Sequence, residues 1–100
     1  MAEVLSAEAV AEGIAGLDGW SGDPTGIRRT AKLPSFMAAV RVVGEVARVA
    51  EEADHHPDID IRWRRLTFSC VTHSAGGVTG KDLALAARID EILRGARDLP

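Results

Sequence analysis

The sequence predicts an α+β fold, in which a four-stranded antiparallel sheet carries three helices packed on one face. Three stretches place apolar residues at the three- and four-residue spacing of a helix, and segments between them alternate apolar and polar residues like half-buried strands. The predicted order is αββαββα. Because each strand has one apolar face, we expect the helices to cover that face. The length of 100 residues predicts a single domain over residues 1–100.

The first helix is expected to follow Ser6, whose side chain suits the N-cap position. Val10, Ile14 and Leu17 come next at spacings of four and three, which is the apolar stripe of about three helical turns. We expect this helix to end near Asp18–Gly19.

The next segment begins with a turn-rich run at residues 21–26, which contains two glycines and a proline. Residues 27–33 are predicted to form a strand, because Ile27 and Leu33 fall on one face while basic and hydroxyl residues fall on the other. Arg29 breaks this alternation, and we interpret it as a sign of an exposed strand edge.

A second, longer helix is predicted to begin after Ser35, which again suits an N-cap. Pro57 disfavours helical geometry at the residue before it, so the helix should end around Asp54. Its predicted buried stripe consists of Phe36, Val40, Val43, Ala47 and Ala50.

A hairpin is predicted from two alternating runs, residues 59–63 and 66–70. The residues left between them are Arg64 and Arg65, so we expect the turn there. Trp63 ends the first run, and we interpret it as core or pocket wall.

The last helix is predicted to follow a loop at residues 73–77. Residues 79–82 read Thr-Gly-Lys-Asp, a pattern similar to a capping box. The helix should continue to Gly95 or just beyond, with its apolar positions at Leu85, Ile89, Ile92 and Ala96.

Composition excludes several classes of function. The net charge of −3 leaves no basic surface for nucleic acid, and we interpret the arginines at 62, 64 and 65 as a solvated strand end. No apolar stretch is long and uncharged enough for a membrane span or a signal peptide. The single cysteine, Cys70, fits a reducing compartment. We therefore expect a cytoplasmic protein that binds neither nucleic acid nor membrane.

The three histidines of the chain are the strongest functional signal. His55, His56 and His73 are the only ones, and Glu51 and Asp54 lie close to the first two in sequence. Imidazole both donates and accepts protons near neutral pH, so histidines beside carboxylates indicate an acid–base site. A zinc site with three histidine ligands is the rival interpretation, although adjacent residues in extended backbone point apart.

The spacing of these residues resembles the signature of the pterin-4a-carbinolamine dehydratases. That pattern here is Glu51, then His55-His56-Pro57, Trp63, His73 and Asp82. The resemblance covers nearly the whole chain and is strongest over residues 20–87. It implies an αββαββα fold and homodimers or homotetramers built by pairing sheets. One departure is Ile59, which stands where many relatives carry an aromatic residue.

The resemblance also implies a function. The family dehydrates 4a-hydroxytetrahydropterin to quinonoid dihydropterin, which recycles the pterin used by an aromatic amino-acid hydroxylase. It implies catalytic roles for His55, His56 and His73, and we add Glu51, which could fix the tautomer of His55. The residues expected to contact the pterin are these histidines together with Asp54, Thr72, Ser74, Trp20 and Asp82.

Proton transfer alone can remove water from a carbinolamine, so we expect no metal and no cofactor.

Two alternatives remain at this stage, one for the role of Asp82 and one for the function of the protein. Asp82 is equally well explained as a helix-start residue, since a carboxylate there complements the helix dipole. The alternative function is a non-catalytic assembly or dimerisation factor of the same fold, but such a scaffold would not need all three histidines.

Overall fold

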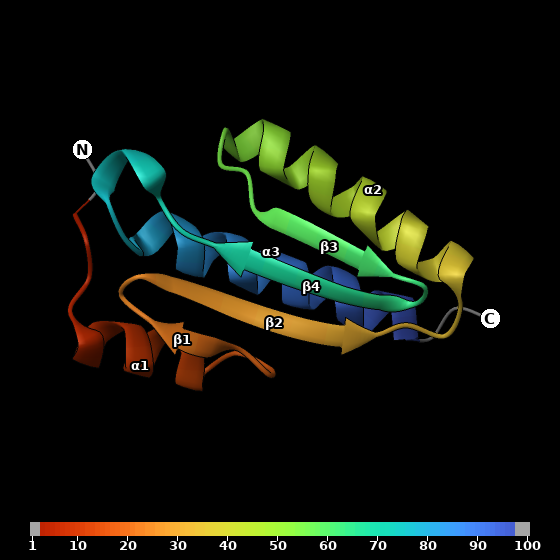
Figure 1. The fold of residues 1–100 in the computed structure, drawn as a ribbon, viewed down its shortest axis with the longest axis horizontal. Helices are drawn as coiled ribbons and strands as arrows, with labels where there is room; N and C mark the ends of the chain where they lie inside the picture. The colour runs from red at the N-terminus through yellow and green to blue at the C-terminus, as the bar shows by residue number, and fades with distance from the viewer. Residues whose placement is uncertain (1–2, 98–100) are drawn as a thin grey trace.

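The computed structural model describes residues 3–97 and confirms the predicted α+β architecture (Figure 1). Helix α2 is preceded by one hairpin and followed by another, and a short 3₁₀ turn, η1, comes before the last helix. The elements are α1 (Ala7–Ala15), β1 (Ser21–Asp23), β2 (Gly26–Lys32), α2 (Phe36–Ala53), β3 (Asp58–Arg62), β4 (Arg65–Cys70), η1 (His73–Ala75) and α3 (Gly80–Arg97).

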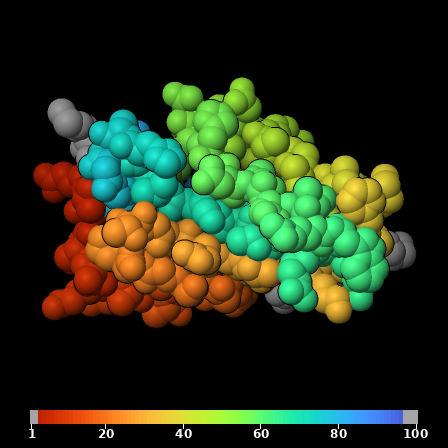
Figure 2. Space-filling model, viewed as in Figure 1, coloured from red at the N-terminus to blue at the C-terminus, as the bar shows by residue number. Residues whose placement is uncertain are grey.

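The four strands form one antiparallel sheet in the order β1-β2-β4-β3. Helices α2 and α3 lie against one face of it, while the other face has no helix over it (Figures 1 and 2). Strand β4 supplies Leu66, Phe68 and Cys70 to the covered face, and all three are buried. No helix in the described part of the chain is long and apolar enough to cross a membrane.

The first hairpin differs from the prediction. Helix α1 ends at Ala15, earlier than expected, and β1 lies inside the run that we assigned to a turn. The tight part of the turn is held by Asp23, whose carboxylate accepts hydrogen bonds from the backbone N–H and hydroxyl of Thr25. These bonds lower the pKa of the Asp23 carboxyl. Gly22 fits because a Cβ there would come within 2.2 Å of the Gly26 carbonyl oxygen.

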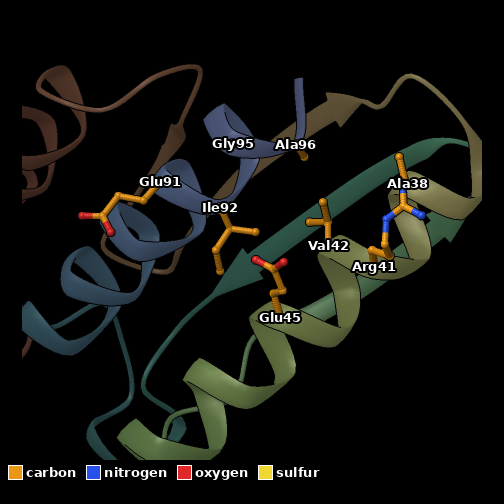
Figure 3. Close-up of a pocket in the computed structure, with 8 residues that line it drawn as sticks. All are labelled: Ala38, Arg41, Val42, Glu45, Glu91, Ile92, Gly95 and Ala96. Carbon is orange, nitrogen blue, oxygen red and sulfur yellow. The ribbon is translucent and has the colours of Figure 1, made fainter. Parts of the chain in front are cut away.

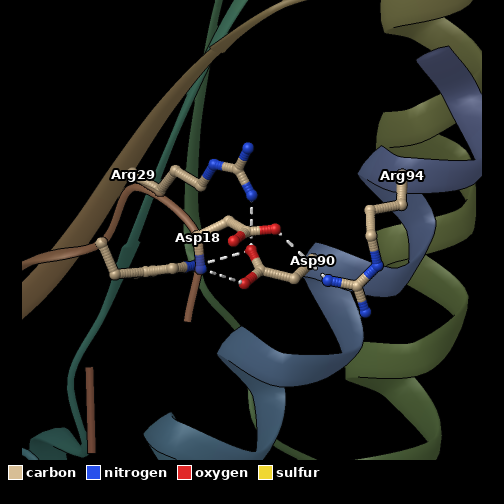
Figure 4. Close-up of polar contacts among 5 residues, drawn as sticks. Asp18, Arg29, Asp90 and Arg94 are labelled. Atoms are coloured by element: carbon tan, nitrogen blue, oxygen red, sulfur yellow. Dashed lines mark hydrogen bonds and ion pairs between the residues drawn. The ribbon is translucent and has the colours of Figure 1, made fainter. Parts of the chain in front are cut away.

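Arg29 on β2 has no partner on β1, whose pairing ends at Arg28, but its side chain is not exposed as our interpretation implied. Its side chain is 5% exposed and faces the covered side of the sheet with Ile27. Its Nη1 donates to Asp90 Oδ1 of α3 at 2.5 Å (Figure 4). The same oxygen accepts from Trp20 Nε1 at 2.8 Å, and Asp90 Oδ2 accepts from the Asp18 backbone N–H. A buried arginine can follow strand alternation when a buried carboxylate compensates it.

Helix α2 begins and ends as predicted but buries a different stripe. Ser35 Oγ accepts a hydrogen bond from the Ala38 N–H at 3.0 Å, which confirms the N-cap. Three members of the predicted stripe are exposed: Phe36 at 49%, Val40 at 41%, and Ala47. Apolar residues occupy more than one row of this helix, so periodicity alone could not select the buried one. The buried positions are Ala38, Ala39, Val42, Val46, Val49 and Ala50.

The second hairpin turns one residue earlier than predicted. Arg62 pairs with Arg65 in the ladder, so the turn consists of Trp63 and Arg64. Trp63 adopts a left-handed conformation with φ 55°, and its side chain is exposed. Of the two alternatives for Trp63, core or pocket wall, the core assignment was therefore wrong. The turn lies at the opposite end of β3 from the loop that follows α2 (Figure 1).

Helix α3 starts and ends where the sequence predicted. Between α2 and α3 runs a groove of about 380 Å³, with Arg41 and Glu45 on one wall and Glu91 on the other (Figure 3). None of the three histidines lines this groove. His55 and His56 follow the other end of α2.

Candidate functional site

The C-terminus of α2 sets the positions of the first two histidines. Asp54 caps the helix in a left-handed conformation, with φ 51° and ψ 44°. The backbone N–H groups of Asp54 and His55 donate hydrogen bonds to carbonyl oxygens in the last turn of the helix. The His55 nitrogen lies 3.0 Å from the Ala50 carbonyl oxygen. Pro57 then follows in the extended lead into β3. The His55–His56 pair therefore sits on a short loop fixed to a long helix.

His55 is paired with a buried carboxylate. Its Nε2 lies 2.5 Å from Asp82 Oδ1, and the two side chains are 11% and 0% exposed. A carboxylate accepts a hydrogen bond, so the shared proton lies on the imidazole Nε2 when the ring is neutral. Nδ1 then carries the lone pair. The Asp82 contact fixes the tautomer and limits the orientation of this ring.

Asp82 is itself held on both oxygens. Its Oδ2 accepts from the Thr72 hydroxyl at 2.8 Å and from the Thr79 backbone N–H at 2.9 Å. The latter is one half of a capping box at the start of α3, so the sequence prediction there is confirmed. The Thr79 hydroxyl lies 2.8 Å from that of Thr72 and accepts from the Lys81 N–H. These contacts connect the end of the second hairpin to His55 through Asp82.

Glu51 contacts His56, and not His55 as we expected. Its Oε1 lies 2.5 Å from His56 Nε2, and the two side chains are 77% and 55% exposed. The reason is the left-handed turn at Asp54, which ends the helix before His55 could face the preceding turn. Exposed pairs of this kind are weak, so this contact orients His56 less firmly than Asp82 orients His55.

His73 lies on the loop that follows β4. It is exposed and begins η1, which also contains the exposed Ser74. The loop is closed by an isolated bridge between Thr72 and Gly77. His73 directly follows Thr72, whose hydroxyl donates to Asp82, the carboxylate that holds His55. The fold thus brings all three histidines to one end of the sheet.

A cavity of about 360 Å³ lies beside His55, between the end of α2 and the start of α3. Its walls combine apolar residues with two cations and one acid, a mixture typical of small-molecule sites. The lining residues are Val49, Glu52, Ala53, His55, Lys81, Ala84, Leu85 and Arg88.

The two remaining residues predicted to contact the pterin, Asp54 and Trp20, lie in different parts of the structure. Asp54 is exposed and caps α2, next to the histidines. Trp20 is buried in the core, where its indole donates to Asp90. Within residues 3–97, no three His, Cys, Asp or Glu side chains are grouped so that they could hold a metal ion.

Thr79 is a site residue that our sequence analysis treated only as a helix start. It is fully buried and contacts both Thr72 and Asp82. Its capping pattern was visible in the sequence, but its second role depends on Thr72, which lies across a loop of six residues. Only the folded arrangement reveals that the cap also supports His55.

The fold and site together define a class: a small α+β protein in which a buried carboxylate orients one imidazole, and two more exposed histidines lie at the same end of the sheet. Comparison with known proteins gives the family. The family model for pterin 4 alpha carbinolamine dehydratase matches residues 3–92. A protein of Roseiflexus castenholzii, provisionally named a pterin-4-alpha-carbinolamine dehydratase, is 53% identical over 93 residues, which are 93% of this chain and 100% of that one. The chain belongs to the pterin-4a-carbinolamine dehydratase family.

Solved structures agree with this fold. The transcriptional coactivator/pterin dehydratase from Brucella melitensis superposes with a TM-score of 0.85 at 31% identity, over 89% of this chain and 97% of that one. A pterin dehydratase-like protein described as a RuBisCO assembly factor in the alpha-carboxysome gives a TM-score of 0.61 at 20% identity, over 74% and 86% of the two chains. The second likeness concerns the fold alone.

Proposed function

We propose that this protein dehydrates 4a-hydroxytetrahydropterin to quinonoid dihydropterin and water. The observation that carries the proposal is the His55–Asp82 pair, a tautomer-fixed imidazole next to a cavity, at the end of the sheet where the other two histidines also lie. Family membership supports the same activity. All groups needed for the reaction are proton donors and acceptors, which this site supplies.

The reaction needs one acid and one base. The C4a–O bond breaks as the leaving hydroxyl takes a proton, and a base removes the proton from the ring N–H, so that one water leaves. We assign His55 as the base, because its Nε2–H is directed to Asp82 and Nδ1 carries the lone pair. His73, which is exposed and exchanges protons with water, is the matching acid. Proton exchange with solvent then restores both rings.

His56 and Glu51 are assigned to binding. Their mutual contact is exposed, and together with Asp54 they form the outer rim of the loop. A carboxylate–imidazole pair presents both donors and acceptors, which suits the polar edge of a pterin ring. Thr72 and Ser74 flank His73 in the sequence and would contact the ring from the opposite loop.

The setting of the reaction is proposed by the same reasoning. A 4a-hydroxypterin arises when a pterin-dependent aromatic amino-acid hydroxylase turns over, so we place this protein in tetrahydropterin recycling, in the cytoplasm, as a homodimer or homotetramer. The second candidate function is a non-catalytic assembly or dimerisation factor. Its support is the likeness of fold to an assembly factor.

A direct dehydration assay separates the two functions. A synthetic 4a-hydroxytetrahydropterin is mixed with the protein, and formation of quinonoid dihydropterin is followed by absorbance against the spontaneous rate. We expect saturable acceleration that scales with protein concentration. A rate equal to the spontaneous one, with protein shown to be folded by circular dichroism, would exclude the enzyme and leave the assembly factor.

A further inference from the structure

The helix-free face of the sheet carries a row of three cations at one end. Lys32 of β2 and Arg62 of β3 both pair with Arg65 of β4, so the three side chains stand directly opposite one another. The next pair along the ladder is Ala31 with the buried Leu66, which faces the helices, so the cations point to the other side. Like charges placed directly opposite on a sheet are destabilising. A bound anion would compensate this repulsion.

The turn between β3 and β4 completes a positively charged hollow next to this row. Its volume is about 270 Å³, and none of the described residues that line it is acidic. The lining residues are Lys32, Arg62, Trp63, Arg64 and Arg65. The carboxylate of Asp60 lies nearby and accepts a hydrogen bond from Arg62 Nε at 3.1 Å, with both side chains exposed. One exposed carboxylate beside four cations leaves the hollow with an excess of positive charge.

Arg64 gives an independent sign of a ligand. Its Nε is buried and has no hydrogen-bond partner in the described part of the chain. Its Nη1 makes only long hydrogen bonds, of 3.4 Å to the Pro34 carbonyl oxygen and 3.5 Å to that of Leu33. Buried polar groups are nearly always paired, so an unpaired donor points to a partner from outside the chain. The surrounding cations favour an anion as that partner.

Trp63 adds an aromatic surface to the hollow. Its side chain is 69% exposed, and its φ of 55° is one that bulky residues rarely adopt. Strained backbone of this kind gathers at functional sites. The Arg64 guanidinium lies 4.8 Å from the centre of the indole ring, and the rest of the ring is open to a flat ligand.

We propose that this hollow binds the phosphate group of a small molecule whose flat ring stacks on Trp63, such as a nucleoside monophosphate. Guanidinium groups bind phosphate oxygens through pairs of parallel hydrogen bonds, and the negative charge of a phosphate matches the excess of cations. The hollow is smaller than a usual site for a whole small molecule, so it suits a compact phosphate with the ring outside on the indole.

This site is separate from the histidines. It lies at the turn end of β3, whereas the loop with His55 and His56 precedes the other end of that strand. The proposal therefore goes beyond the dehydration and does not depend on it. Edge-to-edge pairing of two sheets extends them and leaves their faces open, so an oligomer built in that way keeps the row of cations accessible.

Calorimetric titration of the full chain tests the binding, with AMP as the probe and adenosine and inorganic phosphate as comparisons. We expect saturable binding of AMP with a Kd at or below about 1 mM, weaker binding of phosphate and none of adenosine. Added salt should weaken the binding of AMP. No saturable binding of AMP would overturn the proposal. Tighter binding of a single-stranded oligonucleotide, at equal phosphate concentration, would overturn the assignment to a small molecule.

Variants locate the binding. Lys32→Gln and Arg65→Gln each remove one cation of the row, and Arg28→Gln is the matched control, because Arg28 lies on the same face of β2 but outside this hollow. We expect AMP to bind about 10-fold more weakly to the first two and less than about 2-fold more weakly to the control. Equal losses in all three would show general attraction by surface charge and contradict a site. Trp63→Ala should abolish the preference for AMP over phosphate, and a retained preference would overturn the stacking.

Thermal unfolding gives a second readout, because the row is unfavourable without its ligand. In buffer without phosphate, Lys32→Gln should unfold at the same temperature as the wild type or higher, since it removes repulsion. AMP should raise the Tm of the wild type more than that of Lys32→Gln, relative to sodium chloride at equal ionic strength. A lower Tm for Lys32→Gln in the absence of phosphate would mean that the row serves the fold and not a ligand.

Discussion

Two carboxylates on α3 have different roles, although they are similarly buried. Asp82 and Asp90 are 0% and 1% exposed and lie eight residues apart on one helix. Asp82 accepts from a threonine hydroxyl, a backbone N–H and His55, so it supports the candidate site. Asp90 accepts from an arginine, an indole and a backbone N–H, so it joins the first hairpin to the core. The two sites can be tested separately.

Asp82→Asn should impair turnover more than folding. The amide preserves the shape and can still accept from the Thr79 N–H, but it no longer offers His55 a charged acceptor. We expect kcat to fall by about 10²-fold or more with a smaller change in KM. The nitrogen chemical shifts of His55 should also show a changed tautomer. Glu51→Gln is the control, because it touches only the exposed His56; an equal loss of kcat there would contradict the assignment of His55 as the oriented base.

Arg29→Leu should destabilise the fold strongly. The change leaves the buried Asp90 carboxylate without its cation, which typically costs about 3–5 kcal/mol. Urea unfolding followed by circular dichroism measures the effect. Arg94→Leu is the control, because Arg94 pairs with Asp18 on the surface at 3.4 Å, and such pairs contribute about 0–1 kcal/mol. Equal losses in the two variants would show that Arg29 is not part of a buried network.

The thiol of Cys70 should be inert in the folded protein. Burial, together with the nearby carboxylates of Asp82 and Asp58, raises the pKa of this thiol to about 12. The folded state therefore favours the protonated thiol, and this contribution to stability is lost as the pH rises above the thiol pKa of the unfolded chain. We expect no reaction with a disulfide reagent at pH 8 until the protein is unfolded. Rapid labelling of native protein would contradict this.

At the scale of elements, helix caps were easier to predict from the sequence than the buried face of a helix. Ser6 and Ser35 accept hydrogen bonds from N–H groups three residues on, as the sequence indicated. Pro57 ended α2 as expected. The buried row of α2 was not predictable, because valines occupy several rows and the contacts with α3 and the sheet choose among them. The turn at Trp63 was missed because a bulky residue rarely adopts positive φ.

A pair of valines on α2 tests which face of the helix is buried. Val46 is 0% exposed and Val40 is 41% exposed, although both are valines in the middle turns of the helix. Val46→Ala should lower the free energy of unfolding by about 2 kcal/mol, from lost burial and a residual cavity. Val40→Ala should change it by less than about 0.5 kcal/mol. A larger loss at Val40, measured by urea unfolding at low protein concentration, would mean that the assignment of faces is wrong.

At the scale of the whole molecule, the sequence predicted the sheet, the three helices and the cluster of histidines. It did not predict which carboxylate serves which histidine, because that depends on the left-handed residue at Asp54 and on the cap of α3. Arg29 was misread for a similar reason: its partner Asp90 lies 61 residues away. Contacts between distant segments carry no periodic signal, whereas helix caps and strand alternation do.

The central claim, that these histidines perform the dehydration, is tested most directly by the kinetics of two variants. The kcat/KM for a 4a-hydroxytetrahydropterin is measured for the wild type, His55→Ala and His73→Ala, with folding checked by circular dichroism and thermal unfolding. His73 is exposed, and Asp82 keeps its hydrogen bonds from Thr72 and Thr79 when His55 is replaced, so both variants should fold. We predict losses of about 10²- to 10⁴-fold in each, the usual contribution of a positioned acid or base. Turnover near the wild-type value in either folded variant would contradict the account.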